Sequence, residues 1–581
     1  MRSLSPPKDK DHRSALCSGQ AAWGAVLLGF AIFGLLWTLD TPYRESYVPN
    51  WGDAPVLTDG LLLAPGARWE HWFTRGYSNY YVAYPDWPSS STAFTRPALQ
   101  FVIYLAHFAL GRNWELYRII SCFAAASVPV VAFLIARTVL ELRTGLSLLA
   151  SALVVLSPPV LDCWRIGFSN AHELLATLLV ACAFLAVVAR RDFLCLMLLF
   201  AALLTKENAM WASAAAAITI MLRPKPDEPL RRRAIAAAAM FLPVVLWLSL
   251  RFAFFGGIGG SYATAGYTPL EAFLALTFEK LKNLDALFVV RGPFVTEGHG
   301  ALLDWAIMQG TRLLTCALFS LLALRIMPEI ANRLRYAMRE RHWPTVEAAF
   351  MVPLWAGIAL AFHFALALGA VRYATSVVVF AWPALVAEID RRRQAVLWLG
   401  LTVLCVVSTL RSYRSVELER PSDPRDYSSM RAALQQLPMA TQQVYILADT
   451  DAVPSNPEHM RLILGVPAEI VRIIELQWNC GESNNFVAFD HSMADGVVKL
   501  TATLPACANF MFSARIPDTA LANGRLYRNA TMSYELPEAY PKKEWLFEVG
   551  RRITVHVRPS GPARFIIQHG RPNGIAWFDT P

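Results

Sequence analysis

Two adjacent charged residues, Lys206 and Glu207, interrupt a long apolar stretch of the chain. The apolar runs on either side, 193–204 and 207–222, are short for a membrane crossing, so we expect their junction close to the membrane surface. Charges at that depth are costly and usually serve a function. A lysine there binds a phosphate as a point charge, and the neighbouring glutamate holds it in place. The alternative is an ion pair that only satisfies itself in a helix turn.

A second cationic position is Arg372, which stands with Tyr373 in a turn between two later apolar runs. A planar guanidinium is suited to binding a phosphate. An arginine at a membrane boundary also snorkels to the headgroups without any ligand. Spacing alone leaves these two interpretations equal.

Asp59 stands in the sequence Thr58-Asp59-Gly60, soon after the first apolar run. A carboxylate at a membrane surface can accept the proton of an attacking hydroxyl, although an exposed loop aspartate is more often only solvated. The many aromatic residues around it are typical of a membrane-interface loop.

Asp162 is a further candidate, because it follows Pro158 and Pro159, which we expect to end a helix and turn the chain into an outer loop. His172 follows it in the chain. Glu173 has the position of an ordinary helix-start residue.

The elements that must position these residues are membrane helices. The chain has 581 residues, of which 55% are hydrophobic and 17% charged, and its mean hydropathy is +0.36, whereas a soluble globular chain carries roughly 25% charged residues. Apolar runs alternate with short polar links up to residue 411, as in membrane-spanning helices. The expected spans are 21–39, 118–138, 146–160, 171–189, 193–204, 207–222, 235–254, 302–326, 347–368, 372–389 and 394–411.

Arginine-rich links predict the orientation of these spans. All of them face the cytoplasm if the short run 97–110 lies flat at the outer surface instead of crossing. This choice gives eleven spans, a cytoplasmic segment 1–20, a first outer loop 40–117 and an outer C-terminal domain 412–581. It brings the candidate side chains to one outer face, as expected for an active site on a helical scaffold. The same links account for the net charge of +9, so we exclude a nucleic-acid partner.

The C-terminal domain is predicted to be a small α/β or β-rich domain. Cys480 and Cys507 are both in it, and an oxidising compartment would allow a disulfide between them. Its strand-like runs are 444–447, 497–504, 509–513, 553–558 and 564–568, with a helical stretch near 457–466.

Several known motifs are absent from the sequence. The cysteines have no metal-ligand spacing, and no phosphate loop, nucleophile elbow or paired-histidine motif occurs. The glycine-rich run 256–260 follows a span and not a strand, so it predicts a flexible loop.

In their order along residues 21–411, these motifs resemble the GT-C superfamily of membrane glycosyltransferases, especially the branch of protein O-mannosyltransferases and lipid A aminoarabinose transferases. The likeness is carried by Thr58-Asp59-Gly60, Arg96-Pro97, Leu156 to Asp162, Thr205-Lys206-Glu207 and Val371-Arg372-Tyr373. The family often has two acidic residues in its first motif, whereas Gly60 follows Asp59 here. Asp53, Glu70 and Asp86 are therefore substitutes for Asp59.

The resemblance implies an all-α polytopic membrane domain and a polyprenyl-phosphate sugar donor used at the outer face, with inversion at the sugar carbon. Lys206 and Arg372 would bind the phosphate, Asp59 would be the catalytic base, and Asp162 would orient the acceptor or the lysine. Arg96, Glu207 and Tyr373 complete the expected substrate-binding set. No cofactor is required if the cations neutralise the phosphate, and a divalent cation stays open.

The expected acceptor is a lipid, glycan or protein, and the expected location is the bacterial inner membrane, with membrane lipid around the spans. An oligosaccharide polymerase or ligase that uses a pyrophosphate-linked donor is the nearest alternative. A transporter of lipid-linked sugars would need charges along a path through the membrane, whereas here they gather at one face. Eleven spans are far more than an anchor for the C-terminal domain needs.

Overall fold

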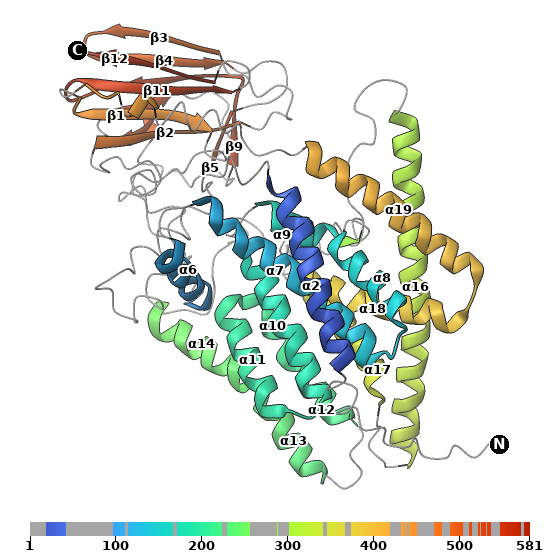
Figure 1. The fold of residues 1–581 in the computed structure, drawn as a ribbon. Coiled ribbons are helices and arrows are strands. Elements are labelled where there is room, and N and C mark those ends of the chain that lie inside the picture. Colours follow the sequence, from blue (N-terminus) through green and yellow to red (C-terminus); the bar gives the residue numbers. More distant parts are fainter. Residues whose placement is uncertain are drawn as a thin grey trace. The chain divides into compact units, whose positions relative to one another are not determined.

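The computed structural model describes two units of the chain. The residues described are 19–41, 97–110, 114–166, 171–223, 229–255, 287–288, 301–340, 346–365, 374–418, 432–434, 436–438, 441–449, 470–478, 488–503, 510–513, 521–522, 525–529, 531–535, 546–570 and 574–581. One unit is helical and the other holds the β-strands (Figure 1). The predicted disulfide partners Cys480 and Cys507 and the predicted helix 457–466 lie outside these residues.

Helices account for the described residues up to 418, as the apolar runs predict. They are α2 (Gly19–Leu39), α6 (Pro97–Leu110), α7 (Trp114–Leu134), the π-helical turn η1 (Ile135–Val139), α8 (Thr144–Val155), α9 (Pro158–Ile166), α10 (Ala171–Val188), α11 (Asp192–Thr205), the 3₁₀ turn η3 (Glu207–Met210), α12 (Trp211–Leu222), α13 (Leu230–Ala239), α14 (Leu242–Phe255), α16 (Ala301–Glu340), α17 (Ala348–Ala365), α18 (Thr375–Arg392) and α19 (Ala395–Leu418).

Several of these helices can cross a membrane. Among the described residues, four are long and apolar enough, and a bent pair raises the number to five if it counts as one span. The four are Ala21–Leu39, Leu116–Val139, Ala171–Val188 and Leu230–Leu250. Shorter apolar helices occupy three further predicted spans, Asp192–Thr205, Ala348–His363 and Ala395–Leu410. The chain is therefore a multi-pass helical protein, while the count of eleven and the flat orientation of α6 stay predictions.

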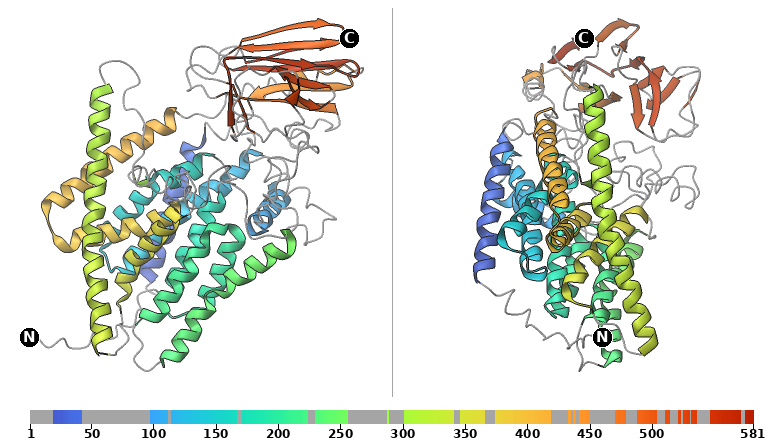
Figure 2. Two further views of the ribbon diagram at one scale, coloured as in Figure 1. Left: turned by 180° about the vertical axis from the view of Figure 1, so that it is seen from behind. Right: turned by 90° about the vertical axis from the view of Figure 1, so that its right-hand side faces the viewer.

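The outer surface of α2 shows what the bundle presents to lipid. In the right-hand view of Figure 2 this dark blue helix lies at the edge of the bundle. Its large apolar side chains face outward, with Trp23 70% and Phe30 74% exposed. Exposed apolar side chains of this size are stable in contact with lipid, whereas their exposure to water would cost free energy.

The bent pair α8 and α9 corrects one expectation. The helix ends at Val155, before the two prolines, and Pro158 begins α9 instead of ending a helix. Proline fits a first helical position, because its missing N–H has no partner there. The break at Ser157 is held by Trp382 of α18, whose Nε1 donates to the Ser157 Oγ at 2.7 Å. Asp162 consequently lies half-buried on a helix, not at the start of an outer loop.

α18 is the central helix of the bundle. It packs against α8, α9, α10, α16 and α17, and nearly all of its residues from Thr375 to Ile389 are buried. Aromatic rings from three other helices surround its Phe380, with Phe184 at a ring-centroid distance of 5.3 Å and Trp355 at 5.5 Å. Close side-chain packing of this kind, and not the exclusion of water, associates helices within a membrane. The start of α18 is thereby fixed relative to α10.

α10 and α11 form an antiparallel pair (Figure 1). The turn between them carries Arg190 and Arg191. At this end Arg223 donates to both carboxylate oxygens of Asp192 at 2.6 Å, and its Nη1 also donates to the Val187 carbonyl oxygen at 3.4 Å. The turn between α10 and α11 and the end of α12 thus meet at this end of the pair. The start of α10 and the end of α11 lie at the opposite end.

The second unit is rich in β-structure, as predicted. Its strands are β1 (Gln443–Asp449), β2 (Val471–Trp478), β3 (Ala488–Ala494), β4 (Val497–Thr503), β5 (Phe510–Ser513), β6 (Leu521–Ala522), β7 (Arg525–Asn529), β8 (Met532–Glu535), β9 (Leu546–Gly550), β10 (Arg552–Val557), β11 (Ala563–Gly570) and β12 (Gly574–Thr580). They form two six-stranded sheets, in the orders β12-β11-β1-β2-β5-β9 and β3-β4-β10-β8-β7-β6.

The two sheets share one apolar core. Tyr445 and Phe565 of the first sheet pack with Leu500 and Val555 of the second, and all four are buried. β1 pairs with β11 and β2 in parallel, whereas the second sheet is antiparallel throughout. The opposite face of the first sheet carries the buried Arg564.

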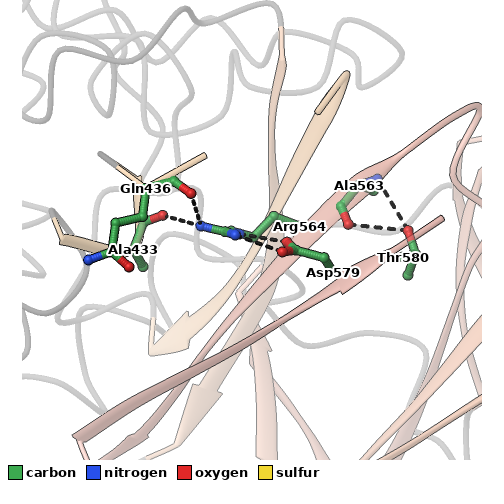
Figure 3. Close-up of polar contacts among 6 residues, drawn as sticks. All are labelled: Ala433, Gln436, Ala563, Arg564, Asp579 and Thr580. Carbon is green, nitrogen blue, oxygen red and sulfur yellow. Dashed lines mark hydrogen bonds and ion pairs between the residues drawn. The ribbon is translucent and has the colours of Figure 1, made fainter. Parts of the chain in front are cut away.

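Arg564 holds this face together (Figure 3). Its Nε and Nη2 donate to the two carboxylate oxygens of Asp579 on β12, at 2.6 and 2.7 Å. Its Nη1 donates to the carbonyl oxygens of Ala433 and Gln436, at 2.7 and 3.0 Å. One guanidinium therefore joins an edge strand to a segment more than a hundred residues earlier in the chain.

Acid is expected to weaken this contact. The hydrogen bonds from Arg564 hold the pKa of Asp579 below its ordinary value, so the carboxylate stabilises the fold above about pH 3.9 and less as the pH falls through its lower folded value. Hydrogen exchange of peptides from β11 and β12, corrected for the intrinsic rate, should show protection falling between about pH 5 and pH 2.5. Asp579→Asn should lower protection already at pH 5 and respond less to acid. An equal acid response in both proteins would contradict the assignment.

Candidate active site

Lys206 lies where α11 ends. The helix ends at Thr205, Lys206 itself is extended (φ −157°, ψ 128°), and η3 begins at Glu207. The backbone N–H of Lys206 still donates to the Ala202 carbonyl oxygen at 2.8 Å. The backbone of Lys206 is therefore held at the end of the helix. Since α11 has 14 residues and thus rises about 21 Å, against a hydrocarbon core of about 30 Å, the turn falls within reach of the membrane core.

Glu173 forms an ion pair with this lysine. The Lys206 Nζ lies 2.9 Å from the Glu173 Oε1, and His172 Nε2 lies 3.3 Å from the same oxygen. The other oxygen, Oε2, accepts a hydrogen bond from the Asn208 Nδ2 at 2.8 Å. Lys206 is 3% exposed and Glu173 1% exposed. A carboxylate in the first turn of α10 is also stabilised by the helix dipole.

Glu207 contacts the same lysine. Its Oε1 lies 3.4 Å from the Lys206 Nζ, and its side chain is 22% exposed. The cluster of Lys206, Glu173, Glu207, His172 and Asn208 therefore holds one ammonium between two carboxylates. Among the described residues, no three His, Cys, Asp or Glu side chains are arranged to hold a metal ion.

The start of α18 is fixed to the same place. The Thr375 Oγ1 lies 2.6 Å from the Thr177 Oγ1 and donates to the Glu173 carbonyl oxygen at 3.4 Å. Arg372 precedes Thr375 by three residues in the sequence. The end of the bundle that carries Lys206 is therefore also the end at which α18 begins.

A buried ion pair joins three other elements of the bundle. Arg118, near the start of α7, donates from Nε to the Asp40 Oδ2 at 3.1 Å, and its Nη2 pairs with the same carboxylate. The Nη2 also donates to the Trp164 carbonyl oxygen on α9 at 3.0 Å. Asp40 follows α2, and both charged residues are at most 1% exposed. Through Trp164 the pair fixes the end of α9, the helix that carries Asp162.

The structure brings the predicted Lys206 and Glu207 together, and it adds residues that the sequence did not indicate. Glu173, expected to be an ordinary helix-start residue, is the central partner of Lys206. Asp40 and Arg118 were not predicted to pair, although opposite charges at the end of one apolar run and the start of the next were a usable signal. The predicted Asp59, Arg96, Arg372 and Tyr373 lie outside the described residues, and their roles stay predictions.

The fold and this cluster define a multi-pass helical membrane protein with buried ion pairs at one end of its bundle. No protein-family model and no curated protein matches the chain. Solved structures similar to it include the following two. One is the Archaeoglobus fulgidus oligosaccharyltransferase in the apo form, at 13% identity and a TM-score of 0.42, covering 80% of this chain and 64% of that chain. The other is ArnT from Cupriavidus metallidurans bound to undecaprenyl phosphate, at 14% identity and a TM-score of 0.39, covering 79% of this chain and 93% of that chain.

Both are distant likenesses of overall fold, and the GT-C family stays a prediction from the sequence motifs. This chain spans 64%, less than two thirds, of the archaeal chain. The roles of individual residues therefore depend on the geometry of this chain itself.

Proposed function

We propose that the protein is a membrane glycosyltransferase that moves a sugar from a polyprenyl-phosphate donor to an acceptor hydroxyl, with inversion, on the extracytoplasmic face. The observation that carries the proposal is the buried cluster at the end of α11, where Lys206 lies 2.9 Å from Glu173. A buried, oriented ammonium at a membrane boundary is suited to a phosphate whose lipid tail lies between helices. This matches the order of motifs along the sequence.

In the proposed reaction the acceptor hydroxyl oxygen attacks the anomeric carbon, and the bond from that carbon to the phosphate oxygen breaks. The electron pair leaves with the polyprenyl phosphate, whose growing charge Lys206 and Arg372 stabilise. Arg96 and Tyr373 are the further substrate-binding residues that the sequence motifs predict. A carboxylate takes the proton of the acceptor, and Asp59 is the proposed base. Asp162, half-buried on α9, orients the acceptor.

The proposal places the C-terminal domain outside the cytoplasm, and the chain in a bacterial inner membrane. A lipid-phosphate donor is proposed, and an oligosaccharide polymerase or ligase that uses a pyrophosphate-linked donor is the alternative. The acceptor class, a lipid, glycan or protein, is left to experiment.

Donor consumption tests this proposal. The full-length protein in detergent would receive a radiolabelled polyprenyl-phosphate sugar and an acceptor extract. Lys206→Met is expected to lower consumption about tenfold or more, the loss expected for one charge-assisted contact, and Asp59→Asn should lower it as well. Arg191→Met, at an exposed position in the turn at the opposite end of α10, is the matched control and should leave the rate unchanged.

Unchanged consumption in both site variants would overturn the site assignment. A parent protein that consumes no donor of this class, while it carries the intact lipid across proteoliposomes, would favour transport instead. The exposed Asp490→Asn variant of β3 serves as the carboxylate control for Asp59→Asn.

A further inference from the structure

One edge of the first sheet presents a tryptophan at its surface. Of the large apolar side chains that the structure describes in the two sheets, two are exposed, Trp577 at 41% and Met493 at 49%. Trp577 lies on β12, the edge strand of its sheet. A single exposed apolar side chain needs no explanation by itself. The surroundings of Trp577 therefore decide what it can bind.

Asp579 is the neighbour of Trp577 on the same face of β12. Residues two positions apart on a strand point to the same side and lie about 7 Å apart. The register agrees, because Trp577 stands opposite Ile566 and Asp579 opposite Arg564. The Asp579 side chain is 44% exposed. An indole ring and a carboxylate are thus both accessible on one face of an edge strand.

The Asp579 carboxylate is held in one orientation and keeps room for a ligand. Arg564 donates from Nε and Nη2 to its two oxygens, at 2.6 and 2.7 Å (Figure 3). The same hydrogen bonds hold the pKa of Asp579 below its ordinary value, so the carboxylate is charged at neutral pH. A carboxylate has about four acceptor positions, and the bonds to Arg564 occupy two of them. The others can accept hydrogen bonds from a ligand.

The opposite face of β12 fixes the backbone of this strand. The Phe578 ring stacks on Phe565, at a ring-centroid distance of 4.9 Å, and on His491 of β3, at 3.9 Å. Tyr445 continues the stack at 4.8 Å from Phe565. Rings from both sheets therefore hold the edge strand in place. The side chains on its outer face are presented by a fixed backbone, as a binding site requires.

We propose that Trp577 and Asp579 form a binding site for a pyranose ring of a glycan. One face of such a ring carries C–H groups, which pack against the electron-rich face of an indole. The hydroxyl groups at the rim of the sugar donate to the carboxylate. The spacing of about 7 Å along the strand is comparable with the width of one sugar ring and its hydroxyl groups. A hydrocarbon chain would supply no donor for Asp579.

The test is direct glycan binding, measured without a sugar donor, so its result does not depend on the transfer reaction proposed above. The full-length protein in nanodiscs would receive cellotetraose, an α-linked mannotriose or chitotriose, and saturation-transfer NMR would report which ligand protons contact the protein. We expect transfer to the ring C–H protons of at least one of these glycans, beyond that from empty nanodiscs. Sorbitol, which has hydroxyl groups but no ring face, should show none.

Variants of the two side chains separate the site from other binding. Trp577→Ala should lower the affinity for the glycan about tenfold or more, because the stacking contact is lost, and Trp577→Phe should recover part of it. Asp579→Asn should weaken binding about fivefold, the loss of a charge-assisted hydrogen bond. Met493→Ala, at the exposed apolar position of β3, is the matched control and should bind as the parent does. Hydrogen exchange of peptides from β11 and β12 shows whether these strands stay folded.

Loss of binding in Trp577→Ala with unchanged protection of β12, and partial recovery in Trp577→Phe, would support the site. Equal affinity of Trp577→Ala and the parent would overturn it, as would an equal loss in Trp577→Ala and Met493→Ala. A parent that binds none of the three glycans would overturn it too. Loss of binding together with lost protection of β12 in both Trp577 variants would make Trp577 a structural residue and remove the proposed role.

Discussion

Replacing Glu173 by glutamine is expected to destabilise the protein by about 3 kcal/mol and to slow donor consumption about 100-fold. The change keeps the shape of the side chain and removes only its charge. Lys206, which is 3% exposed, then loses the carboxylate at 2.9 Å and keeps the contact with Glu207 at 3.4 Å. Removing one partner of a buried ion pair costs about 3–5 kcal/mol, because the other charge stays desolvated. The remaining contact with Glu207 places the expected loss at the lower end.

The expected loss of donor consumption follows from a change in the position of the Lys206 ammonium. Without Glu173 the ammonium turns towards Glu207, and a displacement of about 1 Å of a positioning group costs about 100-fold. The Glu173 carbonyl oxygen accepts a hydrogen bond from Thr375, so the start of α18 reports whether the backbone of α10 has moved. Hydrogen exchange of α18 that matches the parent would assign the loss to charge alone.

A double-mutant cycle with Lys206→Met provides the control. Replacing both partners removes the uncompensated charge, so the double variant should recover most of the lost stability but none of the activity. The unfolding midpoint in detergent and the radiolabelled donor assay give the two readings. Additive losses of stability would show that the two side chains do not depend on each other, contrary to the cluster described above.

The helices of the bundle could be predicted from the sequence where hydropathy alone decides. α2 and α10 begin and end within two residues of the apolar runs that predicted them. The break between α8 and α9 could not be placed, because proline is compatible with both the end and the start of a helix. The position of the break is fixed by the hydrogen bond from Trp382 to Ser157, two residues that are 225 positions apart in the sequence.

The same distinction applies to the candidate site. Lys206 and Glu207 were predictable, since two charges between short apolar runs need no partner elsewhere to be conspicuous. Glu173 carries no such signal, because a glutamate in a first helical turn is ordinary. Only the antiparallel packing of α10 and α11 brings it to Lys206. Neighbouring charges can be found by inspection of a sequence, whereas pairs across helices require the fold.

The strands of the second unit show a similar division. β1, β4, β10 and β11 agree with predicted runs, because each is rich in branched or aromatic residues. β3 was not predicted, since its sequence Ala-Phe-Asp-His-Ser-Met-Ala is mostly polar or small and it is exposed along nearly its whole length. It pairs with β4 through its backbone, and that pairing leaves no pattern of apolar side chains.

Replacing Arg118 by methionine is expected to cost about 3–5 kcal/mol of stability and to loosen α9. The substitution leaves Asp40, which is fully buried, without the guanidinium that neutralises it. The carbonyl oxygen of Trp164 loses the Nη2 donor at 3.0 Å. Arg118→Lys keeps the charge but cannot reach the carboxylate and the carbonyl oxygen with one planar fork, so it should recover only part of the loss.

Hydrogen exchange of peptides from α9, measured beside the unfolding midpoint, separates this local effect from a general loss of stability. Arg223→Met is the control, because it breaks another fork-like pair, between the buried Arg223 and the partly exposed Asp192 at 2.6 Å, at the opposite end of α10. Both variants should unfold at a lower temperature, but only Arg118→Met should expose the amides of α9. Since α9 carries Asp162, donor consumption should then fall more in Arg118→Met than in Arg223→Met at equal stability. Equal protection of α9 in the two variants would mean that the bend at Ser157, and not Arg118, fixes this helix.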